Sequence, residues 1–360
     1  MVGQNKETTM IPLAESEQYA AQQSADWATI STLIPGDHFF RWGTEGLGTA
    51  TNLTFSFYAD TVFNLDQAYR QDLDWTYGPG TADFYEDQSQ VPGFGVVPFS
   101  VDEKSAIQTV LGNWSSISGI QFSQVEDTPD SYGDLRFVQM DFDAWQTVDS
   151  GFKDAAAFAY MPWYDGVLQG DVFIHSAYDA DDGYFDHLVT HEIGHSLGLA
   201  HPHDSVSPVG DGRYPYDEDM QNYGSAMSYD QGSPLNPFTP MQTDIDAIQF
   251  IYGSSDVSLF DDTYRIDIDL FRGESSKAYA RQTIHDEGGF DRLIFDSSAI
   301  NSADDGIFID CADGSWGSFK SSTPIHGADA IDQSGQLYIS KGSQIEAFEC
   351  PPGADTIFDA

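Results

Sequence analysis

Three histidines between residues 191 and 201 have the spacing that most directly indicates chemistry. The stretch reads HEIGHSLGLAH, in a chain that has nine histidines among 360 residues. Apolar residues recur at three- and four-residue steps from Phe185 to Leu197, which predicts an amphipathic helix. His191 and His195 would lie on one face of that helix, one turn apart. Two imidazoles so placed can bind a single cation, so we expect a metal site here.

The other residues of this stretch suit a catalytic site. Glu192 would be offset from both imidazoles, so its side chain can reach the open side of a metal without binding it. Gly198 can adopt the left-handed conformation that ends a helix, which lets the chain turn back and bring His201 to the metal. Three nitrogen ligands and one open position are typical of catalytic zinc. The alternative, a helix that happens to carry surface histidines, explains none of these separate positions.

The same stretch resembles the extended zinc motif of the metzincin metalloendopeptidases. Downstream, SAMSYD (225–230) resembles the methionine turn of that superfamily, with Met227 followed by Tyr229. Pro202, directly after the third histidine, and the Met-Ser-Tyr sequence are similar to the serralysin branch in particular. Looser fragments resemble the same branch in the same order, so that the resemblance covers most of residues 38–253.

This resemblance implies a set of roles for residues of this chain. Zinc would bind His191, His195 and His201, and Glu192 would be the general base. Gly198 and Met227 would be structural, the methionine lying beneath the metal. Tyr229 would donate a hydrogen bond to the carbonyl oxygen as it becomes negatively charged. A protein or peptide substrate would pair with an edge strand formed by Ala157, Phe158, Ala159 and Tyr160.

The chain is expected to have an α+β fold in three parts. Residues 1–37 carry a helical pattern at 14–34 and would be an N-terminal arm or the remnant of a propeptide. Residues 38–253 would be a metzincin-type catalytic domain, with a twisted mixed sheet, long helices and zinc in the cleft. Residues 254–360 have short β-rich runs between Asp, Gly and Ser turns, and would form an all-β domain resembling a β-roll or sandwich.

Local signals place several elements of the catalytic domain. Ser100 and Glu103 form a capping box for a helix that runs to about residue 117. Strands are expected within 49–58, 134–142, 155–162 and 170–175. Asp181 and Asp182 are expected to cap the histidine helix.

Calcium is the second metal that the sequence suggests. The stretch HDEGGFDRLIFD (285–296) resembles a calcium loop that precedes the β-roll of serralysins. Asp286, the Gly288 carbonyl and Asp291 are hard oxygen ligands of the kind calcium prefers. An ordinary Asp-Gly turn into a strand is the alternative. Only GADTIF (353–358) approaches the calcium repeat of the family, so the roll is expected to be degenerate or truncated.

Composition excludes some partners. With 58 acidic and 14 basic residues, the formal net charge is −44, which repels nucleic acid and anionic membrane surfaces. No segment is long and apolar enough to span a membrane. Cys311 and Cys350 form either one disulfide or two free thiols. We expect a monomer.

The first residues, MVGQNKETTM, lack the features of a secretory signal peptide. Serralysin-like proteases leave the cell through an exporter that reads a C-terminal signal. The resemblance therefore implies secretion without an N-terminal signal peptide.

The function that follows is a secreted zinc endopeptidase. A catalytically silent, metzincin-like binding module is the main alternative. Such a module would usually have lost the base or a ligand, whereas Glu192 and the three histidines are all present. A zinc hydrolase of non-peptide amides is a further alternative, which the methionine turn disfavours.

Overall fold

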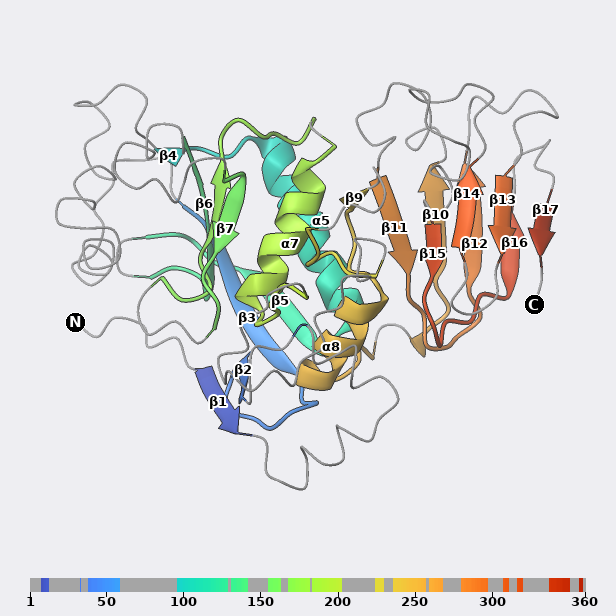
Figure 1. Ribbon diagram of the computed structural model, residues 1–360, viewed down its shortest axis with the longest axis horizontal. Coiled ribbons are helices and arrows are strands. Elements are labelled where there is room, and N and C mark those ends of the chain that lie inside the picture. Colours follow the sequence, from blue (N-terminus) through green and yellow to red (C-terminus); the bar gives the residue numbers. More distant parts are fainter. Residues whose placement is uncertain are drawn as a thin grey trace.

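The computed structural model is shown in Figure 1. It describes residues 8–12, 33, 38–58, 96–128, 131–141, 155–162, 168–181, 183–202, 224–229, 236–256, 259–267, 280–296, 307–310, 316–319, 337–349 and 356–358. The element labels below are those of the figure.

A mixed sheet forms the framework of the N-terminal two thirds. Its strands are ordered β5-β3-β6-β8-β7, and the short β4 pairs with β6. All pairs along this order are parallel except β7 with β8, which is antiparallel. The bounds are Thr51–Phe57 (β3), Val96–Val97 (β4), Ile120–Gln124 (β5), Leu135–Met140 (β6), Ala157–Ala159 (β7) and Val172–His175 (β8).

Three helices accompany this sheet in the described part of the chain. They are α5 (Val101–Ile117), α7 (Phe185–Ser196) and α8 (Gln242–Tyr252). The predicted capping box of α5 is confirmed, because Glu103 N–H donates to Ser100 Oγ and Ser100 N–H donates to Glu103 Oε2. Each of the stretches 49–58, 134–142, 155–162 and 170–175 contains a strand, as predicted, although β7 covers only three residues of its stretch.

The prediction that Asp181 caps the histidine helix is wrong. Helix α7 begins after Tyr184, whose side chain makes no capping hydrogen bond. Asp181 lies upstream in a separate turn, where its N–H donates to Asp179 Oδ1. Asp182 lies outside the described residues. The start of α7 is instead stabilised by packing, since Phe185 and Val189 are fully buried.

One continuous apolar core joins the sheet to the helices. It contains side chains from β3, β6 and β8, the inner faces of α5, α7 and α8, and Met227. Trp114 of α5 and Ile193 of α7 are fully buried within it. Because α7 is packed on several sides, its polar residues are held at fixed positions.

The C-terminal part has two further sheets and a second apolar core. A three-stranded parallel sheet has the order β10-β12-β16, and a six-stranded sheet has the order β17-β13-β14-β15-β11-β9. Figure 1 shows these strands together on the right, beyond α8. The bounds are Asn236–Pro237 (β9), Thr263–Asp267 (β10), Ala280–Ile284 (β11), Arg292–Asp296 (β12), Ile307–Asp310 (β13), Trp316–Phe319 (β14), Leu337–Ile339 (β15), Ala347–Glu349 (β16) and Thr356–Phe358 (β17).

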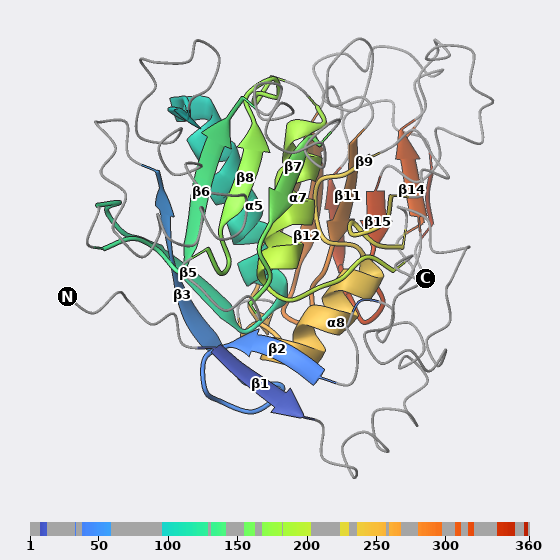
Figure 2. The ribbon, with the colours of Figure 1, turned by 60° about the vertical axis from the view of Figure 1, so that its left-hand side comes forward.

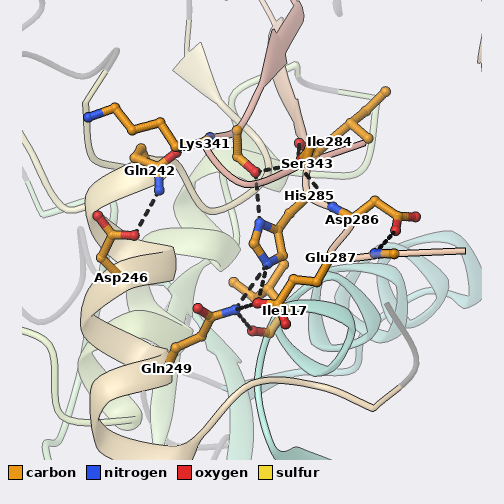
Figure 3. Close-up of polar contacts among 12 residues, drawn as sticks. Ile117, Gln242, Asp246, Gln249, Ile284, His285, Asp286, Glu287, Lys341 and Ser343 are labelled. Carbon is orange, nitrogen blue, oxygen red and sulfur yellow. Dashed lines mark hydrogen bonds and ion pairs between the residues drawn. The ribbon is translucent and has the colours of Figure 1, made fainter. Parts of the chain in front are cut away.

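Several contacts join the two parts of the chain, and two of them involve β9 and α8. Strand β9 precedes α8 in sequence, but it pairs with β11 of the C-terminal sheet. Figure 3 shows the second junction, where Gln249 of α8 donates to Ile117 O and to Glu287 Oε1, both at 2.9 Å. His285 completes this junction, with Nδ1 at 2.7 Å from Ser340 Oγ.

Near the N-terminus, β1 (Thr8–Pro12) pairs antiparallel with β2 (His38–Trp42), as seen in the lower part of Figure 2. The helix expected within 14–34 lies outside the described residues, except for Leu33, which is fully buried. Within the described ranges, no helix combines the length and apolarity needed to cross a membrane.

Candidate metal centre and active site

The histidines of α7 meet the third histidine at their Nε2 atoms. The Nε2 atoms of His191 and His195 are 3.0 Å apart, and each lies close to His201 Nε2, at 3.1 and 2.9 Å respectively. His191 and His195 are buried, and His201 is half-buried. The sequence-predicted set of three ligands is therefore brought together.

Backbone carbonyls fix the proton on two of these rings. His191 Nδ1 lies 2.8 Å from Ala226 O, and His195 Nδ1 lies 2.7 Å from Leu199 O. A carbonyl oxygen can only accept, so Nδ1 carries the hydrogen and Nε2 carries a lone pair. Burial, together with the neighbouring histidines, lowers the pKa of His191 well below its usual value. The His191 ring is consequently neutral, which is the state a metal requires of a histidine ligand.

Such an arrangement fits a cation. Three nitrogen atoms about 3 Å apart, with two lone pairs aimed at the same point, repel one another unless a positive charge lies between them. Imidazole nitrogens are ligands that zinc prefers. The donor set and its fixed tautomers thus form a zinc-binding triad.

Gly198 brings His201 to this triad as the sequence predicted. Its φ is +108°, a conformation that side chains other than glycine rarely adopt. Leu199 N–H donates back to Gly194 O at 2.9 Å, which closes the helix end. On the following turn, Ala200 N–H donates to Leu33 O at 2.7 Å. The backbone next to His201 is therefore held by the buried residue Leu33.

The methionine turn (residues 225–229) lies beneath the triad. Met227 is fully buried. A Cβ atom on Gly194 would lie 2.4 Å from Met227 Sδ, so only glycine leaves space for this sulfur. Asp244 of α8 fastens the turn, because it accepts from Ser225 Oγ at 2.6 Å and from Ala226 N–H at 2.7 Å. Since Ala226 O contacts His191, α8 helps to orient the first ligand.

Glu192 and Tyr229 border the triad. Glu192 is 4% exposed, and its Oε2 has no hydrogen-bond partner among the described residues. Burial raises the pKa of Glu192 to about 8, which a nearby cation would oppose. Tyr229 is 61% exposed, and its ring centroid lies 4.3 Å from that of His201 and 5.1 Å from that of His191.

A cavity of about 290 Å³ opens beside these groups. Its walls come from the segment that enters β7, from the first half of α7 and from the methionine turn. The lining residues are Ala155, Ala156, Ala157, Tyr184, His187, Leu188, His191, Glu192 and Tyr229. The ligand His191, the Glu192 carboxylate and a space large enough for a side chain therefore adjoin one another.

Strand β7 is the last strand of the described sheet and lies beside α7 (Figures 1 and 2). His175 N–H donates to Ala156 O, and Tyr160 N–H donates to Asp171 O. Because bonded and open positions alternate in an antiparallel pair, the backbone groups of Ala157 and Ala159 face away from β8. The Phe158 ring is stacked on Phe173, with centroids 4.7 Å apart.

A second cluster of candidate ligands lies at the start of the C-terminal part. Carboxylate oxygens of Asp262, Asp286 and Asp291 lie within 4.8 Å of one another. Asp286 and Asp291 are fully buried, and Asp291 Oδ2 has no partner among the described residues. Burial, reinforced by the charge of Asp291, raises the pKa of Asp286 to about 6. The cluster fits a hard divalent cation.

Some functional positions were missed from the sequence. Asp262 lies 24 residues before Asp286, and only the pairing of β10 with β12 brings the two together. Gly194 stands between the histidines of the motif, where a glycine in a buried helix is itself a signal of close packing. His187 lies four residues before His191, a spacing that places it on the metal-facing side of the helix. Cys311 and Cys350 lie outside the described residues.

Comparisons with known proteins agree with this geometry. The Matrixin family of peptidases matches residues 99–211. The serralysin of Photorhabdus sp. (strain Az29) is 26% identical over 290 residues, 73% of this chain and 52% of the relative. Metallopeptidase AprA of Pseudomonas marginalis is 27% identical over 316 residues, 78% of this chain and 63% of the relative.

A third relative extends the pattern: serralysin C of Dickeya chrysanthemi is 27% identical over 295 residues, 73% of this chain and 59% of the relative. The chain spans about half the length of the curated relatives it matches. The match of the family model includes the triad, Glu192 and Gly198.

Proposed function

Because this chain contains a matrixin-type metallopeptidase domain and is a distant homologue of serralysins, we propose that it is a zinc-dependent endopeptidase that acts on proteins or peptides. The observation that carries the proposal is the convergence of three histidine Nε2 atoms, one of which belongs to His191, a residue that lines an open cavity together with the buried carboxylate Glu192. A module kept only for binding would not need an intact base beside intact ligands.

The proposed mechanism assigns the proton transfers to Glu192. When bound by His191, His195 and His201, zinc supplies Lewis acidity, which polarises a peptide carbonyl and lowers the pKa of a water molecule. Glu192 takes a proton from the attacking water and delivers it to the leaving amine. Its unpartnered Oε2 leaves one oxygen available for this proton. Burial of the carboxylate makes its basicity sensitive to the nearby charge.

Tyr229 is the proposed donor to the developing oxyanion. Its ring rests against His191 and His201, and its side chain is largely exposed. A phenol held beside the ligands in this way can donate to a carbonyl oxygen as negative charge develops there.

The substrate backbone is proposed to pair with β7. Ala157 and Ala159 direct backbone hydrogen-bonding groups away from β8, so an extended peptide can add as the next strand. The rings of Phe158 and Tyr160 both contact the ring of Phe173 in β8, and these contacts would hold β7 in place when a peptide binds. This arrangement supports recognition of the main chain rather than of one residue type.

We propose calcium as the ligand of the aspartate cluster. Asp286 and Asp291 supply carboxylates, and Asp262 supplies a third. The Gly288 carbonyl is the proposed fourth ligand, in a loop where Gly288 N–H donates to Asp286 Oδ1. The unpartnered oxygen of Asp291 supports a cation here, because an unpaired buried carboxylate is costly.

The proposed domain boundaries are those predicted, 38–253 and 254–360. Two separate apolar cores support them, although β9 crosses to the C-terminal sheet. We propose that these later strands form a reduced β-roll, since β10, β12 and β16 pair in parallel. Residues 1–37 are proposed to be an integral arm, because the carbonyl of Leu33 holds the backbone next to His201.

Secretion is proposed on the resemblance to serralysins. The predicted monomeric state remains a proposal, and the exclusion of nucleic acid is a proposal that rests on net charge.

Hydrolysis of casein tests the proposed function. The purified protein should cleave casein, lose this activity with a zinc chelator and regain it when zinc is restored. Changing His201 to Ala should lower the zinc content from about one per chain, as expected for a single three-histidine site. Absence of cleavage by the zinc-loaded protein would favour the silent binding module instead.

A further inference from the structure

His187 is a buried titratable residue that the proposed mechanism does not use. It lies one helical turn before His191 on α7 and lines the cavity with His191 and Glu192. It is only 6% exposed, and its ring centroid is 5.3 Å from that of Tyr184. It is not a member of the histidine cluster. Its place in the cavity wall suggests a role in choosing the substrate.

One hydrogen bond fixes which nitrogen of His187 carries the proton. Nδ1 lies 2.7 Å from Pro237 O. Because a carbonyl oxygen can only accept, Nδ1 must be the donor. An imidazole of ordinary pKa is mostly neutral at pH 7. In a neutral ring with the hydrogen on Nδ1, Nε2 can only accept.

The fold holds this tautomer in place. Pro237 belongs to β9, and the residue after it, Phe238, accepts a 2.9 Å hydrogen bond from Thr190 Oγ1 of α7. Two contacts therefore fasten the β9 segment to the same helix turn. Since Pro237 occupies the Nδ1 edge of the ring, Nε2 is the nitrogen that remains for the cavity.

The rest of the cavity wall gives space on one side, while Tyr184 and Tyr229 are further polar residues in its lining. Ala155, Ala156 and Ala157 are small, and Leu188 is apolar. A cavity of about 290 Å³ admits a long side chain. The one carboxylate in its wall, Glu192, disfavours a second negative charge.

We propose that this cavity receives the side chain beside the scissile bond, and that His187 Nε2 selects uncharged side chains ending in a hydrogen-bond donor, such as glutamine or tyrosine. This inference rests on the proposed peptidase function. The carboxylate of a glutamate in the same place would face the lone pair of His187 Nε2, and the two would repel each other. Methionine, with nearly the same length as glutamine, would leave Nε2 without a donor. The positive charge of lysine or arginine would lose its hydration in the cavity and lie close to the divalent cation, so these side chains should bind poorly.

Matched peptides test the preference. One series carries glutamine, methionine or glutamate at a single position beside the cleaved bond, with each side of the bond varied in turn. When the varied residue lies on the side of the scissile bond that enters the cavity, wild-type protein should prefer glutamine to methionine. The kcat/KM for the glutamine peptide should be about 2- to 10-fold higher, the range expected for one hydrogen bond. The glutamate peptide should be the poorest.

Two variants separate the hydrogen bond from the shape of the cavity. His187→Leu removes the acceptor, so the glutamine and methionine peptides should be cleaved equally. Leu188→Ala enlarges the same cavity without changing its polar groups, so it should keep the preference for glutamine. Equal cleavage of both peptides by the wild-type protein would overturn the inference while leaving the proposed function intact. No cleavage of any peptide by the zinc-loaded protein would overturn both.

A readout independent of activity is the tautomer itself. In wild-type protein with ¹⁵N-labelled histidine, two-bond ¹H–¹⁵N correlation at pH 7 should show His187 protonated on Nδ1 and unprotonated on Nε2. A proton on Nε2, in either a neutral or a charged ring, would overturn the inference even if His187→Leu fails to fold.

Discussion

At the scale of single residues, the site depends on where protons and lone pairs are held. Carbonyl oxygens of Ala226 and Leu199 keep the hydrogens of His191 and His195 on Nδ1. Sequence spacing predicted His191 and His195 as ligands, because i and i+4 residues share a helix face. His201 was predicted from Gly198, which ends the helix and lets the chain turn back. It did not predict these carbonyls, because they come from segments that reach the histidines only through tertiary folding.

Tyr229→Phe tests the residue that is proposed to stabilise the transition state. The change keeps the ring against His191 and His201 and removes only the hydroxyl. Turnover should fall by roughly 10²–10³, as for other lost oxyanion donors. Zinc content, KM and melting temperature should hardly change, since the side chain is 61% exposed. Turnover close to that of the wild type would remove Tyr229 from the mechanism.

At the scale of elements, close contact between α7 and the methionine turn decides the geometry. Periodicity and a capping box were enough to predict α5 and α7, since both repeat apolar residues over several turns. The start of α7 was misjudged, because Asp181 takes part in a turn of its own. Asp262 escaped prediction because strand pairing, not sequence proximity, brings it to Asp286 and Asp291.

Two glycine-to-alanine changes test the packing of α7. In Gly194→Ala, the new methyl group would meet the buried Met227 sulfur at 2.4 Å. Overpacking of this kind costs about 1–3 kcal/mol, so the melting temperature should fall and zinc should bind more weakly. Gly112→Ala in α5 is the matched control, because its Cβ meets nothing within 4 Å. That change should raise stability by up to ~1 kcal/mol. Equal melting temperatures for the two variants would contradict the packing argument.

At the scale of the whole molecule, the part that carries the histidine triad and the β-rich part meet through β9 and the junction around Gln249. The proposed calcium loop begins one residue after His285 of that junction (Figure 3). The change from helical to β-rich character near residue 254 was visible in the sequence. The strand that crosses between the parts was not, because its two residues carry no pattern.

Calcium should stabilise the molecule modestly. Saturating calcium at about 100 times its dissociation constant would add roughly 2.7 kcal/mol at one site. We expect a melting shift of a few degrees, and Asp291→Ala should abolish it. Asp296→Ala is the control. Asp296 is an exposed carboxylate at the end of β12, where it pairs with Arg265 and lies outside the aspartate cluster, so this variant should retain the shift. Complete unfolding of the C-terminal part on calcium removal would show that more calcium sites exist than this single cluster.

The most direct test of the central claim compares hydrolysis and zinc content in one variant. Glu192→Ala removes the proposed base but none of the proposed ligands. It should keep about one zinc per chain, as expected for a three-histidine site, while its rate of casein hydrolysis falls by 10²–10⁴-fold or more, about the loss expected for a general base. If the Glu192→Ala protein holds its full zinc and still hydrolyses casein at the wild-type rate, Glu192 is not the general base and the account is contradicted.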